Sequence, residues 1–120
     1  RPLRYGVHFW LSDGANVLLR RRPPRGLLGG MSELPGPTWR AEPWSPAEIA
    51  AAAPMPAQWR PAGEVRHGFT HFELRIAMYA AEVARIDAEG VVTPLAALEG
   101  AALPGVMRKC IAAVVGGGPR

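Results

Sequence analysis

The sequence has a single cysteine, Cys110, and only three histidines among its 120 residues. One cysteine cannot form an internal disulfide, and with three histidines it cannot complete a cysteine-built zinc or iron–sulfur site. No apolar run approaches the roughly 20 residues that a transmembrane helix needs, and no charged start precedes an apolar segment as in signal peptides. We therefore expect a soluble, intracellular domain that is held together by its core alone.

Lysine is nearly absent, because 13 of the 14 cationic residues are arginine, against ten acidic residues. The resulting net charge of +4 fits an anionic partner but is too small to establish one. Apolar residues make up 48% and charged residues 20%, which are ordinary globular proportions. We expect one monomeric domain over residues 1–115 and a flexible tail over 116–120. Because the chain opens on Arg1 rather than Met, we also expect a longer parent protein.

The hydrophobic pattern predicts an α+β fold. Strands are expected at residues 3–11, 17–19, 31–34, 64–83 and 91–92. Helical segments are expected at 46–53, at 94–98 and from Pro104 onward. The first of these is opened by the capping box Ser45-Pro46-Ala47-Glu48, and in the long strand a loop or corner is expected at 67–71 because of Gly68. The predicted order, β-β-β-α-β-β-α, makes a sandwich of sheet and helices.

A basic loop, residues 20–30, contains Arg20, Arg21, Arg22 and Arg25, followed by glycines. Guanidinium groups donate planar pairs of hydrogen bonds that suit phosphate oxygens, and glycines allow the backbone to approach closely. The alternative is a solvated loop whose glycines only turn the chain.

A second candidate is the segment His67–Phe72, where two imidazoles, two aromatic rings and a hydroxyl surround Gly68. This mixture can stack on a nucleobase and hydrogen-bond to its edge. The alternative is that Phe69 and Phe72 belong to the core and that backbone groups satisfy the histidines. A metal site on His67 and His71 is disfavoured, because spacing i,i+4 brings side chains together on a helix and this segment is extended.

Three blocks of sequence carry a family resemblance. They are Arg21–Gly36 (RRPPRGLLGGMSELPG) followed by Trp39, Val65–Leu74 (VRHGFTHFEL) and Leu103–Lys109 (LPGVMRK). In this order they resemble the C-terminal domain of the MutY family of adenine DNA glycosylases, over nearly the whole chain. The resemblance implies a Nudix-like fold, with a mixed β-sheet packed between helices, that reads 8-oxoguanine opposite the adenine to be removed.

The resemblance also implies site residues. The family contacts the oxidised base with a Phe-Ser-His loop, and Phe69, Thr70 and His71 occupy that place here. Thr70 keeps the hydroxyl and adds a methyl group, Phe69 would stack beside the base, and His71 would bind a phosphate or brace the loop. Arg20, Arg21, Arg22 and Arg25 are assigned to the DNA backbone. Ser32 departs from relatives that often carry an aromatic residue there.

The partners implied by the resemblance are duplex DNA with an 8-oxoguanine:adenine mispair and an N-terminal catalytic domain of the same protein. That domain would carry the catalytic residues and a four-cysteine iron–sulfur cluster, so we expect no catalytic residue, metal or cofactor in this chain. A cytoplasmic, nucleoid-associated location in a bacterium is expected.

Two rival functions remain. A Nudix pyrophosphatase acting on 8-oxo-dGTP or another nucleoside diphosphate derivative needs several glutamates on a helix to hold Mg²⁺. Glu42 is acceptably spaced for this, but the following helix reads Ala50–Ala53 where glutamates are required. A protein-interaction module with the same fold is the other rival, and it leaves the basic loop and the Phe69–His71 segment without a role.

Overall fold

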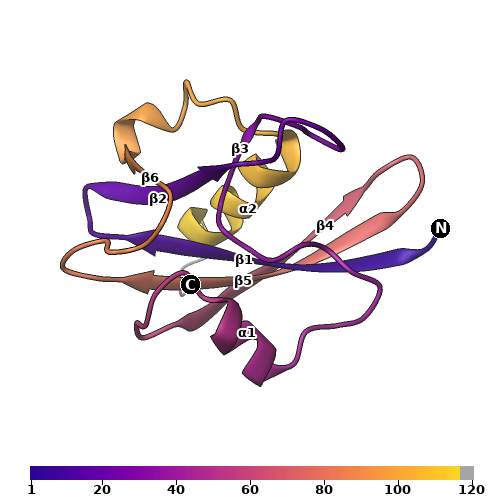
Figure 1. The fold of residues 1–120 in the computed structure, drawn as a ribbon, viewed down its shortest axis with the longest axis horizontal. Coiled ribbons are helices and arrows are strands. Elements are labelled where there is room, and N and C mark those ends of the chain that lie inside the picture. Colours follow the sequence, from indigo (N-terminus) through magenta and orange to yellow (C-terminus); the bar gives the residue numbers. More distant parts are fainter. Residues whose placement is uncertain (117–120) are drawn as a thin grey trace.

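The computed structural model describes residues 1–116 and contains six strands, two α-helices and one short 3-10 helix (Figure 1). The strands are β1 (Leu3–Ser12), β2 (Asn16–Arg21), β3 (Ser32–Glu33), β4 (Arg60–Gly68), β5 (Glu73–Glu82) and β6 (Val91–Pro94). The helices are α1 (Pro46–Ala52), η1 (Leu95–Ala97) and α2 (Gly105–Gly116). None of the described helices is long and apolar enough to cross a membrane.

The strands form one mixed sheet in the order β3-β2-β1-β5-β4, with β6 paired to β2. β1 and β5 run parallel along their whole lengths, from Leu3 beside Glu73 to Ser12 beside Glu82. The β1–β2 and β4–β5 pairs are antiparallel. The parallel pair therefore brings residues about 70 positions apart in the sequence to the middle of the sheet.

Both faces of the central strands are covered, because α1 and α2 lie on opposite sides of β1 and β5 (Figure 1). Towards α2, Leu74, Ile76 and Met78 of β5 pack with Met107 and Cys110 of α2 in the larger core cluster. Burial raises the pKa of the Cys110 thiol to about 12, which makes it an inert core group. On the α1 side, Phe9 of β1 and Tyr79 of β5 line a pocket together with Ile49 and Ala50 of α1.

Most sequence predictions of the fold are confirmed: the first hairpin, the short strands, the capping box on Ser45 and the apolar stripe of α2. The predicted order is wrong by one strand, because β4 precedes the loop and β5 follows it. β4 is an edge strand with only Val65 buried and a bulge between Pro61 and Gly63, so its sequence lacks the alternation typical of a strand. Of the tail expected at 116–120, Gly116 ends α2, and the rest lies outside the described residues.

Candidate nucleic-acid interface

The β4–β5 hairpin ends in a four-residue turn, Phe69–Phe72. The Phe69 amide donates a hydrogen bond of 2.8 Å to the Phe72 carbonyl, which closes the turn. Thr70 and His71 are exposed at its tip, whereas Phe69 and Phe72 are half-buried with their rings stacked at 4.8 Å. The turn thus presents a hydroxyl and an imidazole to solvent on an aromatic base.

An aromatic cluster fixes this base in place. The Phe69 ring contacts His67 edge-on at 4.7 Å and lies 5.9 Å from Trp39, while Phe72 lies 6.5 Å from Trp39. Burial, together with the positive charge of Lys109, lowers the pKa of His67 below its ordinary value, so its ring favours the neutral form. Phe69 therefore packs mainly under the hairpin rather than standing free at its tip.

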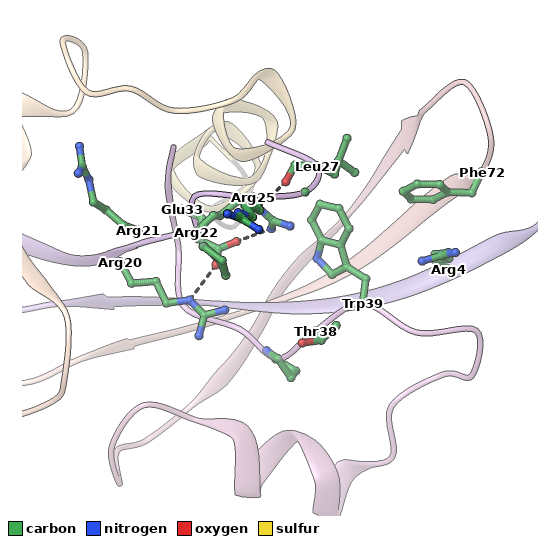
Figure 2. A pocket seen from close by; sticks show the side chains of 13 residues that line it. Arg4, Arg20, Arg21, Arg22, Arg25, Leu27, Glu33, Thr38, Trp39 and Phe72 are labelled. Atoms are coloured by element: carbon green, nitrogen blue, oxygen red, sulfur yellow. Dashed lines mark hydrogen bonds and ion pairs between the residues drawn. The ribbon is translucent and has the colours of Figure 1, made fainter. Parts of the chain in front are cut away.

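A cleft of about 580 Å³ separates the hairpin base from the basic loop (Figure 2). Trp39 and Phe72 form its aromatic wall. Its charged lining consists of Arg4, Arg20, Arg21, Arg22, Arg25 and Glu33. These six residues carry a net charge of +4, the same as the entire chain, so the cationic and acidic residues elsewhere balance. The cleft is where the excess positive charge of the chain is concentrated.

Glu33 holds two of these arginines. Its side chain is only 2% exposed, and its two carboxylate oxygens accept hydrogen bonds from Arg20 Nε at 2.8 Å and Arg22 Nη1 at 2.9 Å. Arg20 also donates to the Gly36 carbonyl, and Arg22 donates to the Leu27 carbonyl and stacks over Trp39. Arg20 and Arg22 thus brace the inner wall of the cleft.

Arg4, Arg21 and Arg25 are exposed, and within residues 1–116 no hydrogen bond or ion pair of their guanidinium groups is found. Arg4 stacks over the Phe72 ring at 4.8 Å. Arg21 lies at the end of the cleft away from Phe72, and its side chain extends away from the other arginines (Figure 2). The prediction of a loop from Arg20 is wrong for its first two residues, because Arg20 and Arg21 belong to β2 and pair with β3. The predicted basic run is divided into paired and unpaired cations.

His8 supports the cleft from below. It is buried on β1, where its Nδ1 lies 2.7 Å from the Leu34 carbonyl and its Nε2 lies 3.0 Å from Trp39 Nε1. Because an indole N–H only donates, His8 Nε2 must accept the hydrogen bond from Trp39. His8 Nδ1 must therefore carry the proton and donate a hydrogen bond to the Leu34 carbonyl. Desolvation lowers the pKa of His8 below its ordinary value, which agrees with this neutral ring.

Helix α1 offers little for a metal ion. Its one carboxylate, Glu48, accepts hydrogen bonds from both terminal nitrogens of Arg40, at 2.7 and 2.8 Å, and from the Ser45 amide. These bonds, the Arg40 pair first, lower the pKa of Glu48 to about 2. Glu42 is exposed, and among the described residues no three His, Cys, Asp or Glu side chains lie together as a metal site requires.

The four predicted arginines, Arg20, Arg21, Arg22 and Arg25, line the cleft together with Phe72, some 50 residues away in the sequence. Phe69, Thr70 and His71 lie in the adjoining turn and do not line the cleft. Sequence reasoning missed Arg4, Glu33 and Trp39 as parts of this site. Arg4 stands alone in a strand, so no local pattern marks it. Glu33 could have been found from the sequence, because it is the only acidic residue in a short apolar strand just before Pro35 and Gly36. A buried carboxylate in such a strand indicates a cationic partner.

Comparison with known proteins agrees with this architecture. The model of the NUDIX domain family matches residues 7–113. Human adenine DNA glycosylase is 40% identical in an alignment of 75 residues that covers 55% of this chain and 13% of that protein. The chain thus spans about one eighth of the length of this curated relative.

Solved structures share the fold. The C-terminal domain of mouse MUTYH, solved in complex with human PCNA, has a TM-score of 0.74 at 24% identity and covers 95% of this chain and 88% of its own. The MutT protein from Methanosarcina mazei Go1 has a TM-score of 0.68 at 16% identity and covers 100% and 98%. The α+β fold with a mixed sheet between helices is confirmed, and the chain belongs to the NUDIX domain family.

Proposed function

We propose that this domain recognises 8-oxoguanine opposite adenine in duplex DNA and directs an adenine DNA glycosylase to that mispair. The observation that carries the proposal is the hairpin tip. Thr70 and His71 are exposed on a rigid aromatic base, and this base also forms one wall of the cationic cleft. The human relative, an adenine DNA glycosylase, supports the same role.

The chemistry of the lesion fits a hydroxyl at this position. Oxidation at C8 turns guanine N7 from an acceptor into an N–H donor and adds a carbonyl oxygen. A threonine hydroxyl both donates and accepts, so Thr70 can answer either change. His71, next to it, would contact a neighbouring phosphate.

Phe69 has a different part in this proposal. Because its ring packs against His67, Phe72 and Trp39, it holds the turn at a fixed height above the sheet. Contact between Phe69 and the nucleobase would then use only the ring edge that the aromatic cluster leaves uncovered. The catalytic residues and the iron–sulfur cluster of such a glycosylase are proposed to lie in another domain of the parent protein.

Thr70→Ala in the full-length parent enzyme tests the proposal. We expect the rate on adenine opposite 8-oxoguanine to fall by about tenfold, since loss of one buried hydrogen bond costs about 1–2 kcal/mol. The rate on adenine opposite plain guanine should change much less. Thr70→Ser should restore the preference because it retains the hydroxyl.

Thr93→Ala provides a matched control, because Thr93 lies on β6, where its hydroxyl bonds only to the Val91 carbonyl. This variant should leave both rates unchanged. An unaltered ratio of the two rates in a folded Thr70→Ala enzyme would remove Thr70 from the recognition site. Equal loss on both substrates together with a lowered melting temperature would instead assign Thr70 to the stability of the turn.

A further inference from the structure

We propose that Arg4 and Arg25 form a phosphate clamp, one residue on each side of the cleft, that holds the backbone of the DNA strand read by the hairpin tip. This inference rests on the proposed function and deepens it. It moves the backbone contact from the four arginines of the basic loop to one of them and to a residue of β1.

The first argument is the occupancy of the guanidinium groups. Arg20 and Arg22 both donate hydrogen bonds to Glu33. Arg20 also donates to the Gly36 carbonyl, and Arg22 to the Leu27 carbonyl. A guanidinium bound to a carboxylate has lost much of its field and of its donors for a second anion. Arg4, Arg21 and Arg25 keep all their donors and line the cleft. The Arg21 side chain extends away from the other arginines (Figure 2), which leaves Arg4 and Arg25 for one ligand.

The second argument is preorganisation. Arg4 lies over the Phe72 ring, whose centroid is 4.8 Å from its Cζ. Stacking restricts the long side chain while leaving the in-plane N–H groups open, and these are the groups that bind phosphate oxygens. Less side-chain freedom is then lost when the phosphate arrives.

The third argument is position. Phe72 is the last residue of the turn that carries Thr70, so Arg4 lies at the base of this turn. Arg25 lies on the opposite side of the Trp39 ring in Figure 2, at the basic loop. A strand that touches Thr70 would therefore pass both cations in crossing the cleft.

The test measures how salt weakens binding of the 120-residue chain to a duplex with one 8-oxoguanine:adenine mispair. Each phosphate contact contributes a slope of about −0.9 in a plot of log affinity against log salt. Arg4→Gln and Arg25→Gln should each reduce the slope by about that amount and weaken binding about fivefold near physiological salt. The double variant should show twice the change, and Arg4→Lys should keep the slope because the charge remains.

Arg85→Gln is the matched control, because Arg85 is equally exposed but lies in the β5–β6 connection, away from the hairpin (Figure 1). Its slope should equal that of the parent chain. Equal effects of Arg85→Gln and Arg4→Gln would replace the clamp by a diffuse field. Unchanged slopes in the Arg4 and Arg25 variants, with DNA still bound and Thr70 still selective, would overturn the clamp but leave the proposed function standing. Absence of DNA binding by the parent chain would overturn the clamp, while the Thr70→Ala test in the full-length enzyme would still decide the proposed function separately.

Discussion

Four of the five arginines that line the cleft form an inner pair, Arg20 and Arg22, and an outer pair, Arg4 and Arg25. The fifth, Arg21, extends away from the others (Figure 2). The inner pair shares one carboxylate that is 2% exposed, and the outer pair has no acidic partner among the described residues. The sequence shows three of these four as equivalent members of one basic run. Whether an arginine is free to bind a ligand depends on its distance in space from Glu33, and not on its place in the basic run.

Removal of the shared carboxylate should have the largest effect on this comparison. Glu33→Gln leaves two guanidinium groups without their counter-charge and should lower the free energy of unfolding by about 3 kcal/mol. This value lies at the lower end for loss of one partner from a buried ion pair, because the Arg20 and Arg22 side chains are 43% and 20% exposed and can be hydrated. Thermal unfolding should show a fall in melting temperature of about 10 °C.

Glu64→Gln provides the matched exposed case. Glu64 lies 3.5 Å from Arg66, with both side chains more than half exposed, so its loss should cost less than about 0.5 kcal/mol. Equal destabilisation by the two glutamine variants would show that Glu33 does not organise the inner pair.

His8→Phe should have the next largest effect, since it leaves the half-buried Trp39 indole N–H and the buried Leu34 carbonyl without their partner. A loss of about 1–3 kcal/mol in the free energy of unfolding is expected at pH 7.5. The parent chain should itself lose stability as the pH falls below about 6.5, because the unfolded state takes up a proton that the buried ring resists.

Urea denaturation between pH 7.5 and 5.5 measures both effects. The His8→Phe variant should show a flatter pH dependence than the parent chain. His67, whose pKa is lowered by burial as well, accounts for the pH dependence that remains in this variant. A His8→Phe chain as pH-sensitive as the parent would mean that another group causes the acid sensitivity.

The smallest expected effect concerns α1, whose carboxylate Glu48 is paired with Arg40 as fully as Glu33 is with the inner pair. With Mg²⁺ and 8-oxo-dGTP we expect no release of pyrophosphate, and Glu42→Gln should change nothing. Magnesium-dependent release that Glu42→Gln abolishes would show that this domain keeps a carboxylate for catalysis.

Local signals predicted most of the fold. The capping box at Ser45 and the turn at Ser12–Gly14 are each predicted from a few adjacent residues, and both are confirmed. β4 escaped prediction because an edge strand with one buried side chain has no alternation to detect. The hairpin tip and the basic loop were found as separate segments, whereas their meeting place was not.

That meeting place depends on contacts distant in sequence. Arg4 reaches Phe72 through the parallel pairing of β1 with β5, and His8 supports Trp39 across 31 positions. No window of neighbouring residues contains either relation. The division into paired and unpaired arginines likewise depends on the pairing of β2 with β3, which places Glu33 beside Arg20.

The parallel pairing of β1 and β5 also has a consequence for how the domain becomes competent. It joins the first strand to one that begins at Glu73, so a loop of about 70 residues must close before β1 gains its second neighbour. Such non-local pairing slows folding and delays it until most of the chain has been synthesised. Until β5 pairs with β1, Phe72 is not held beside Arg4, so the cations of the cleft are exposed without an ordered aromatic wall. Selective DNA binding should therefore arise late in folding, once β5 has paired with β1.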